Sequence, residues 1–370
     1  MSEVLDRSKN SAIRTGIATG IVDCDIHPTM RSQAELHPWL PERWRKHLAE
    51  YGLQARVPFT TGTQYPKAAP ATARRDAWPP NGGPPGSDLS FLQAQLLNAN
   101  DIAIGMLTPL HGSARNTDLD AAYCTAVNEW QLERWVRQDQ RLRGSVIVAH
   151  EDPDLAVEEI ARRADDHSFV QVLIPSKTNE PLGRKRYWPL FAAAQAADLP
   201  IAVHVNSVGG GYASTPSGWP SYYLQDHHIN VHSFQALIAS LVLEGVFEKF
   251  PRLRMVMIEG GFAWLPALCW RLDQQWALMR NEVADCKRPP SEYIREHIWF
   301  TTQPMEEPEQ ADHLRDTLTW IGWDRIMFAT DYPHWDYDDP RNAFPIRLSP
   351  AEHAMIFRDN AMKLYRLHSE

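Results

Sequence analysis

A repeating alternation of short apolar runs and helix-like segments constrains the fold of this chain more than any other feature. The runs are apolar almost throughout, as strands buried on both faces are. A helical pattern, or an insertion and then a helix, follows each run. We expect strands at 21–27, 102–107, 144–150, 169–175, 201–206, 254–261, 298–302 and 325–331. We expect helices at 87–99, 118–140, 154–166, 187–197, 231–250, 262–283 and 307–318, and further helices at the C-terminus.

Eight strand–helix units in a chain of 370 residues fit a single (β/α)8 TIM barrel. The main alternative is an open α/β sheet, but no glycine-rich phosphate loop follows the first strand. We therefore predict one domain over residues 1–370. Residues 29–87 interrupt the alternation of strands and helices, and their later part is rich in Pro, Gly and Ala. We interpret them as an ordered insertion that forms a lid over the C-terminal face of the barrel, and a disordered linker is the alternative.

Acidic and histidine side chains end several of these strands, where a barrel carries its chemistry. In the first strand, Asp25 and His27 are two residues apart and share a face. His204, Glu259 and Asp331 end the fifth, sixth and eighth strands. Taken singly, each has a simpler explanation as a hydrogen-bonded core histidine or a turn cap. Together they predict a metal site, since two imidazoles and three carboxylates suit Zn²⁺, Mn²⁺ or Fe²⁺.

Further histidines lie near the expected mouth of the barrel. His228 and His232 come before or at the start of the helix after strand five, and His334 follows Asp331 by three residues. They are candidates for binding a second metal or a substrate carboxylate, or for carrying protons. For the neighbouring His227 we favour loop polarity and helix capping.

The composition argues against several classes of protein. A net charge of −9 with no basic run argues against nucleic acid as a partner. The N-terminus lacks an apolar signal segment and no stretch approaches a membrane span, so we expect a cytoplasmic protein that binds no membrane. The four cysteines form no CxxC pair and are expected to be reduced. No Gly-x-Ser-x-Gly motif supports a serine hydrolase.

The strand-end motifs resemble those of the amidohydrolase superfamily, in the branch related to aminocarboxymuconate semialdehyde decarboxylase. The resemblance spans nearly the whole chain and rests on Val22–Pro28, Ala202–Asn206, Gly245–Pro251, Ile258–Gly261, Phe328–His334 and Asn360–Tyr365. It implies the metal ligands Asp25, His27, His204 and Asp331, and it implies that Asp331 takes or delivers a proton.

Two positions depart from the usual pattern of that branch. Asp25 replaces the first histidine of a His-x-His pair, and Glu259 stands where the branch usually has histidine. Glu259 makes the site more anionic and favours Mn or Fe over Zn. We include Glu259 among the candidate ligands and, with His204 and Asp331, among the catalytic candidates.

The resemblance implies a metal-dependent enzyme that hydrolyses or decarboxylates a small carboxylate or amide through a metal-activated water or carboxyl. A first alternative keeps the site but changes the chemistry, because some relatives are non-haem dinuclear Fe or Mn/Fe oxygenases (monooxygenases). A second alternative is an inactive barrel paired with an active paralogue, because two ligand positions are substituted. We also expect a homo- or hetero-oligomer with a related barrel. Its interface would use helices that carry Trp130 and Trp135, or Trp270 and Trp276.

Overall fold

Eight parallel strands form the centre of the molecule. The computed structural model describes residues 20–53, 66–110, 114, 116–205, 218–229 and 231–367. Within this part of the chain the strands pair in the order of the sequence. They are β1 (Ile21–Ile26), β2 (Ile102–Leu107), β3 (Leu142–Ile147), β4 (Phe169–Pro175), β5 (Ile201–His204), β6 (Met255–Ile258), β7 (Ile298–Thr301) and β8 (Ile326–Met327).

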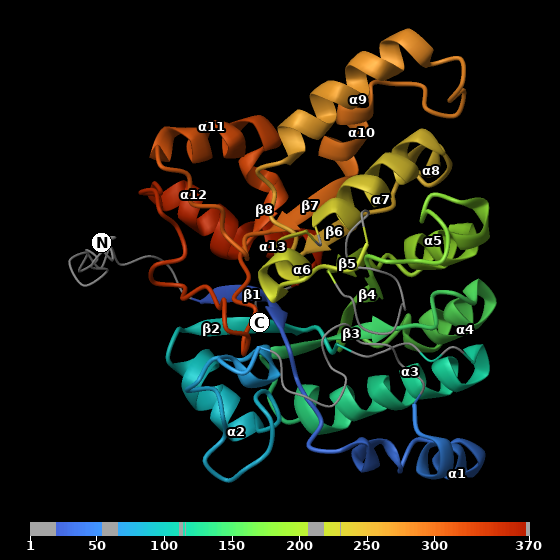
Figure 1. Cartoon of the computed structure of the whole chain (residues 1–370), viewed down its shortest axis with the longest axis vertical. Coiled ribbons are helices and arrows are strands. Elements are labelled where there is room, and N and C mark those ends of the chain that lie inside the picture. The colour runs from blue at the N-terminus through green and yellow to red at the C-terminus, as the bar shows by residue number, and fades with distance from the viewer. Residues whose placement is uncertain are drawn as a thin grey trace.

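Hydrogen bonds between β1 and the segment around the end of β8 close the sheet into a barrel. The Cys24 N–H donates to the Phe328 carbonyl at 3.0 Å, and the His27 N–H donates to the Tyr332 carbonyl at 2.8 Å. Helices surround the strands in Figure 1. The predicted (β/α)8 barrel is therefore confirmed.

The helices alternate with the strands along the chain. The α-helices are α1 (Glu42–Tyr51), α2 (Leu89–Leu92), α3 (Thr117–Gln131), α4 (Pro153–Arg163), α5 (Trp188–Ala196), α6 (Tyr223–Ile229), α7 (Val231–Leu243), α8 (Val246–Lys249), α9 (Leu265–Met279), α10 (Pro290–His297), α11 (Ala311–Ile321), α12 (Pro350–Ala354) and α13 (Asn360–Leu364). A π-helical turn continues each of α2, α3 and α12.

Most helices lie where the sequence pattern predicts them, and the differences have local causes. The Asp88 side chain caps α2 by accepting a hydrogen bond from the Phe91 N–H, as expected. The helix expected over 231–250 is two helices, because Gly245 between them adopts a φ of +74°. The pattern does not predict α6 or α10, which are only seven and eight residues long.

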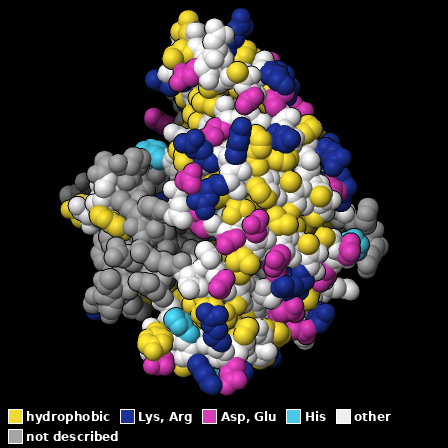
Figure 2. Space-filling view, turned by 90° about the vertical axis from the view of Figure 1, so that its right-hand side faces the viewer, with side chains coloured by type: hydrophobic (Ala, Val, Ile, Leu, Met, Phe, Trp, Pro, Cys, Tyr) yellow, Lys and Arg dark blue, Asp and Glu magenta, His cyan; other side chains and the backbone are white. Residues whose placement is uncertain are grey.

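Charged side chains of both signs are interspersed with hydrophobic ones on the described part of the face that Figure 2 presents. Trp130 and Trp135 are 1% and 3% exposed, so the expectation that they pack between chains is wrong. Trp270 on α9 is 59% exposed, and the oligomer stays a prediction. Among the described residues, no helix is long and apolar enough to cross a membrane.

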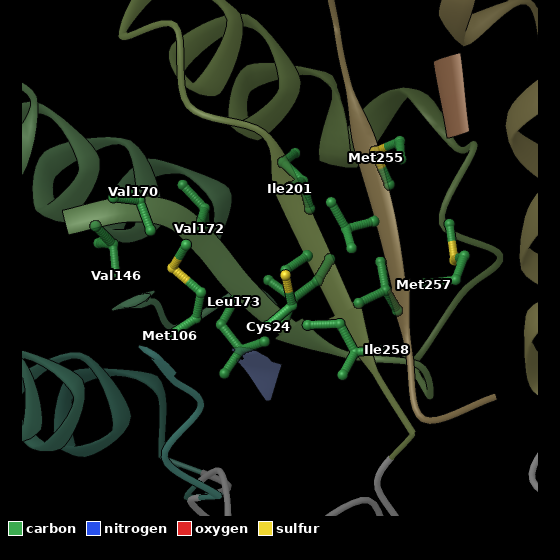
Figure 3. Close-up of a cluster of buried hydrophobic side chains, with 14 of the residues drawn as sticks. Cys24, Met106, Val146, Val170, Val172, Leu173, Ile201, Met255, Met257 and Ile258 are labelled. Carbon is green, nitrogen blue, oxygen red and sulfur yellow. The ribbon is translucent and has the colours of Figure 1, made fainter. Parts of the chain in front are cut away.

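Apolar side chains from successive strands fill the core. Figure 3 shows Cys24 of β1 and Met106 of β2 in one cluster with Val172, Ile201 and Met255 of β4 to β6. All five are at most 2% exposed. Burial of this kind stabilises the barrel by about 25 cal/mol per Å² of apolar surface, and it fixes the strands whose ends carry the polar residues of interest.

The insertion at 29–87 returns to the mouth of the barrel. Its residues 54–65 lie outside the described part of the chain. The Arg74 N–H donates to the Pro333 carbonyl at 3.0 Å, and the Trp335 N–H donates to the Thr72 carbonyl at 2.8 Å. A Cβ at Gly86 would lie 2.3 Å from the His27 carbonyl oxygen, so only glycine allows this approach. The insertion therefore contacts both β1 and the loop after β8.

Candidate metal site

Two buried imidazoles at the mouth are held by backbone carbonyls. Nδ1 of His27 lies 2.8 Å from the Thr108 carbonyl oxygen, and Nδ1 of His204 lies 2.5 Å from that of Val205. A carbonyl oxygen only accepts, so each Nδ1 must carry the proton. In the neutral ring, Nε2 then presents a lone pair to the cavity. Histidines that bind metals are fixed in this way.

Both Nε2 atoms face carboxylate oxygens. Nε2 of His27 is 2.8 Å from Oδ1 of Asp331, and Nε2 of His204 is 3.0 Å from Oε2 of Glu259 and 3.5 Å from Oδ2 of Asp25. Oδ2 of Asp25 and Nε2 of His204 are buried and lie at ion-pair distance, but neither makes a hydrogen bond among the described residues. A buried carboxylate oxygen without a hydrogen bond is costly, and a cation between these atoms would remove the cost.

The backbone at two strand ends is strained where the carboxylates are presented. Glu259 follows β6 and Asp331 lies just beyond β8, and both adopt a φ of +60°. Residues other than glycine seldom occupy this left-handed region, and such strain clusters at functional sites. The Thr301 hydroxyl oxygen supports the turn by accepting from the Glu259 N–H at 3.1 Å.

The structure groups most of the predicted residues into overlapping sets. Three sets bring their potential ligand atoms within 4.8 Å of one another: Asp25, His27, His204 and Glu259; His27, Glu259, Asp331 and His334; and His227, Glu259 and Asp336. Glu259 belongs to all three sets. Asp331 is not a member of the first set. It contacts His27, which belongs to both the first and the second set, and it does not share a set with His204.

Two predicted histidines stand apart from this cluster. His228 and His232 have exposed side chains and belong to none of the three sets of described residues. His227, for which the sequence favours a capping role, faces Asp336 instead, with Nε2 2.9 Å from its Oδ2. The structure therefore brings His227, rather than His228, close to the other potential ligands.

The sequence pattern misses two polar residues that also end strands. The Thr108 hydroxyl, just after β2, donates to Oδ1 of Asp25. Gln303, shortly after β7, donates from Nε2 to Oδ2 of Asp331 at 3.2 Å and to Oδ2 of Asp336 at 3.0 Å. Their positions after strands could indicate them, but neutral hydroxyl and amide side chains do not stand out as metal ligands in the sequence.

The electrostatics of the site show an excess of negative charge. Burial opposes charge on His204, yet the Asp25 and Glu259 carboxylates raise its pKa to about 10. Burial and the charge of Glu259 raise the pKa of Asp331 well above its usual value. Protons therefore bind tightly at the positions that a cation would take, and a metal ion would displace them.

Comparison with known proteins assigns the family. The family model described as Amidohydrolase matches residues 22–367. The chain belongs to this family. It is an enzyme of the branch that the strand-end motifs predict, which also contains the gamma-resorcylate decarboxylases.

Curated relatives and solved structures agree on this placement. Gamma-resorcylate decarboxylase of a Polaromonas species is 28% identical over 255 residues, which cover 65% of this chain and 75% of that protein. The Rhodococcus jostii enzyme of the same name is 26% identical over 312 residues, covering 76% and 92%. A dihydroxybenzoic acid decarboxylase from Polaromonas, with bound manganese and 2-nitroresorcinol, has the same fold, with a TM-score of 0.66, 20% identity and coverage of 95% and 98%.

Proposed function

We propose that this enzyme is a metal-dependent carboxy-lyase that removes CO₂ from a small aromatic carboxylate. The observation that carries the proposal is the pair of imidazoles, fixed through Nδ1, whose Nε2 atoms face buried carboxylates. The relatives named above, with 28% and 26% identity, are decarboxylases of a hydroxylated benzoate by name, which supports carboxylates over amides as substrates.

The residues present fit a divalent cation. Asp25, His27, His204 and Asp331 would hold it, and Glu259 would complete the set of ligands. Carboxylates outnumber imidazoles in this set, which favours Mn²⁺ or Fe²⁺ over Zn²⁺. When bound, the cation would polarise the substrate's carboxylate and an adjacent hydroxyl oxygen.

The chain's own residues supply a path for the proton that replaces CO₂ on the aromatic ring. Decarboxylation breaks the bond between the ring and the carboxyl carbon, and a proton takes the vacated position. Asp331 would deliver it. Nδ1 of His334 lies 2.6 Å from Oδ1 of Asp331, and the His334 side chain is 18% exposed, so it can pass protons from solvent.

We further propose that residues 29–87 act as a lid within a single barrel domain. The hydrogen bonds of Thr72 and Arg74 to the loop after β8 support this role. The guanidinium of Arg74 also lies 4.2 Å from the centre of the Tyr337 ring, which fastens the insertion beside the mouth. Exclusion of water from a decarboxylation site strengthens its electrostatic interactions.

A direct assay tests the proposed reaction. Metal-free protein is reconstituted with Mn²⁺, and CO₂ release is measured with a panel of hydroxylated benzoates that includes gamma-resorcylate. Benzamides of matched substitution provide the control. We expect CO₂ release from at least one acid, loss of the activity with chelator, and recovery with Mn²⁺. Hydrolysis of the amides without decarboxylation of any acid would contradict the proposal.

The second candidate function is a dinuclear oxygenase, and the participation of Glu259 in all three ligand sets favours it. The test loads the protein with Fe²⁺ and measures O₂ consumption with the same acids. Conversion of Glu259→His should restore the usual residue of the branch and shift metal preference toward Zn²⁺. Substrate-dependent O₂ uptake without CO₂ release would replace the carboxy-lyase proposal.

An inactive barrel is the least supported alternative. Asp25 replaces a histidine but still presents an oxygen atom to His204, and Glu259 does the same. The two substitutions therefore change the ligand type without removing a ligand. The CO₂ and O₂ assays also test this alternative, which predicts neither reaction and no bound metal.

A further inference from the structure

A third group of potential ligands adjoins the site just described, and two of its members, His227 and Asp336, play no part in the proposed reaction. His227 comes from α6 and Asp336 from the loop after β8, 109 residues apart in sequence. Nε2 of His227 lies 2.9 Å from Oδ2 of Asp336. Glu259 brings a carboxylate oxygen within 4.8 Å of both ligand atoms. One imidazole and two carboxylates thus converge from three separate segments.

The His227 ring is held in place by aromatic neighbours. It stacks on Tyr223, one turn earlier in α6, with ring centres 5.7 Å apart and planes 18° apart. The Trp335 ring centre lies 5.5 Å from that of His227, and Nε1 of Trp335 donates to the Tyr223 hydroxyl at 3.1 Å. This support limits the rotation of the imidazole, as second-layer contacts do around metal-binding histidines.

Gln303 contacts this group and carries a buried polar atom without a hydrogen bond. Its side chain is fully buried and its Nε2 donates to Asp331 and Asp336. Its Oε1 is buried and has no hydrogen-bond partner within the described residues. A buried amide oxygen normally accepts a hydrogen bond or binds a cation.

Charge balance points to the same conclusion. Four carboxylates, those of Asp25, Glu259, Asp331 and Asp336, lie in the three overlapping ligand sets. Asp331 holds the proton of the proposed reaction, so three carboxylates remain, and one divalent cation leaves them with negative charge that a second cation would offset while the imidazoles stay neutral. Glu259 has two carboxylate oxygens and lies in every set, so it can bind one ion with each oxygen.

We propose that His227, Glu259 and Asp336 bind a second divalent cation, with Glu259 shared between this ion and the first. One nitrogen and two carboxylate oxygens leave further positions for water, a set that suits Mn²⁺ or Fe²⁺. The second ion neutralises the outer carboxylates and offers a binding position to a second oxygen of the substrate. The proposal requires the first metal site but is independent of the reaction catalysed there.

The test counts Mn²⁺ ions on the full-length protein. Metal-free protein is dialysed against Mn²⁺, and bound metal is measured by mass spectrometry while binding is followed by calorimetry. We expect two ions per wild-type chain and one ion in His227→Ala and in Asp336→Asn. His228→Ala is the matched control, because His228 is the next residue on α6, is exposed and belongs to no ligand set. It should keep both ions.

Electron paramagnetic resonance separates a shared-ligand pair from two distant ions. Wild type should give the spectrum of two exchange-coupled Mn²⁺ ions, and His227→Ala that of an isolated ion. His227→Gln, with circular dichroism as a check on folding, serves if His227→Ala is unstable. One ion in wild type, or two coupled ions in both variants, overturns the proposal. Two coupled ions without CO₂ release would leave the second site standing and refute the carboxy-lyase function.

Discussion

Two carboxylates on β1, Asp23 and Asp25, occupy the same strand two residues apart and are both fully buried, yet their surroundings differ. Asp23 accepts hydrogen bonds from the Thr330 N–H at 2.9 Å and the Thr330 hydroxyl at 2.6 Å, and one from the Asp25 N–H at 3.2 Å. Asp25 receives one hydrogen bond, from the Thr108 hydroxyl, and its Oδ2 makes none among the described residues, although it lies 3.5 Å from Nε2 of His204.

The same contrast between satisfied and unsatisfied buried polar groups distinguishes the polar network on β3 and β4 from the mouth of the barrel. A polar network on β3 and β4 satisfies its members: Gln171 donates to Ser145 at 2.9 Å, Ser145 donates to the Leu107 carbonyl at 2.6 Å, and Tyr365 donates to Gln171 at 2.8 Å. At the mouth, Oδ2 of Asp25 and Nε2 of His204 make no hydrogen bond among the described residues. Satisfied buried groups hold the fold together, whereas an unsatisfied atom inside a cluster of potential metal ligands points to a bound cation.

Replacing an imidazole at the mouth should have the largest effect. We expect His204→Ala to lower metal affinity by more than about 100-fold and to abolish activity, because removing a ligand costs more than removing the group that orients it. Metal analysis after dialysis measures the loss. His232→Ala, which changes an exposed histidine outside the ligand sets, should retain its metal. Full metal content in His204→Ala would show that His204 is structural.

A pair of variants on β1 tests the comparison itself. Asp23→Ala leaves the N–H and the hydroxyl of Thr330 without their acceptor. We therefore expect it to lower the free energy of unfolding of metal-free protein by about 3 kcal/mol. Asp25→Asn should lose the extra stability that Mn²⁺ confers on wild type, whereas Asp23→Ala should keep it. Urea unfolding with Mn²⁺ and with chelator measures both quantities. If Mn²⁺ still stabilises Asp25→Asn as it does wild type, Asp25 is not a ligand.

The sequence predicts the barrel and the grouping of its strand-end side chains well, because both follow from short-range patterns. Continuous apolar runs identify the strands, and closure of the barrel brings Asp25, His27 and His204 together without knowledge of the loops. His227 and Asp336 are different, since their meeting depends on the paths of α6 and of the loop after β8. The pattern of polar and apolar residues along the chain does not predict the contact between His227 and Asp336. For this reason the sequence favours a capping role for His227.

A variant in the satisfied network should have the smallest effect. Tyr365→Phe leaves Oε1 of Gln171 without its donor, and we expect a loss of about 1 to 2 kcal/mol in the free energy of unfolding. Metal content and activity should not change, because neither residue lies in a ligand set. Urea unfolding together with metal analysis provides the measurement. A substantial loss of metal from this variant would mean that the two regions are not independent.

The central claim is that the clustered imidazoles and carboxylates at the mouth are the ligands of a metal centre. A crystal structure of the Mn²⁺-loaded protein, with an anomalous difference map at the manganese edge, tests it most directly. We predict a peak that contacts Nε2 of both His27 and His204 together with an oxygen of Asp25. Manganese bound only elsewhere, with these three side chains still facing one another unoccupied, would contradict the account.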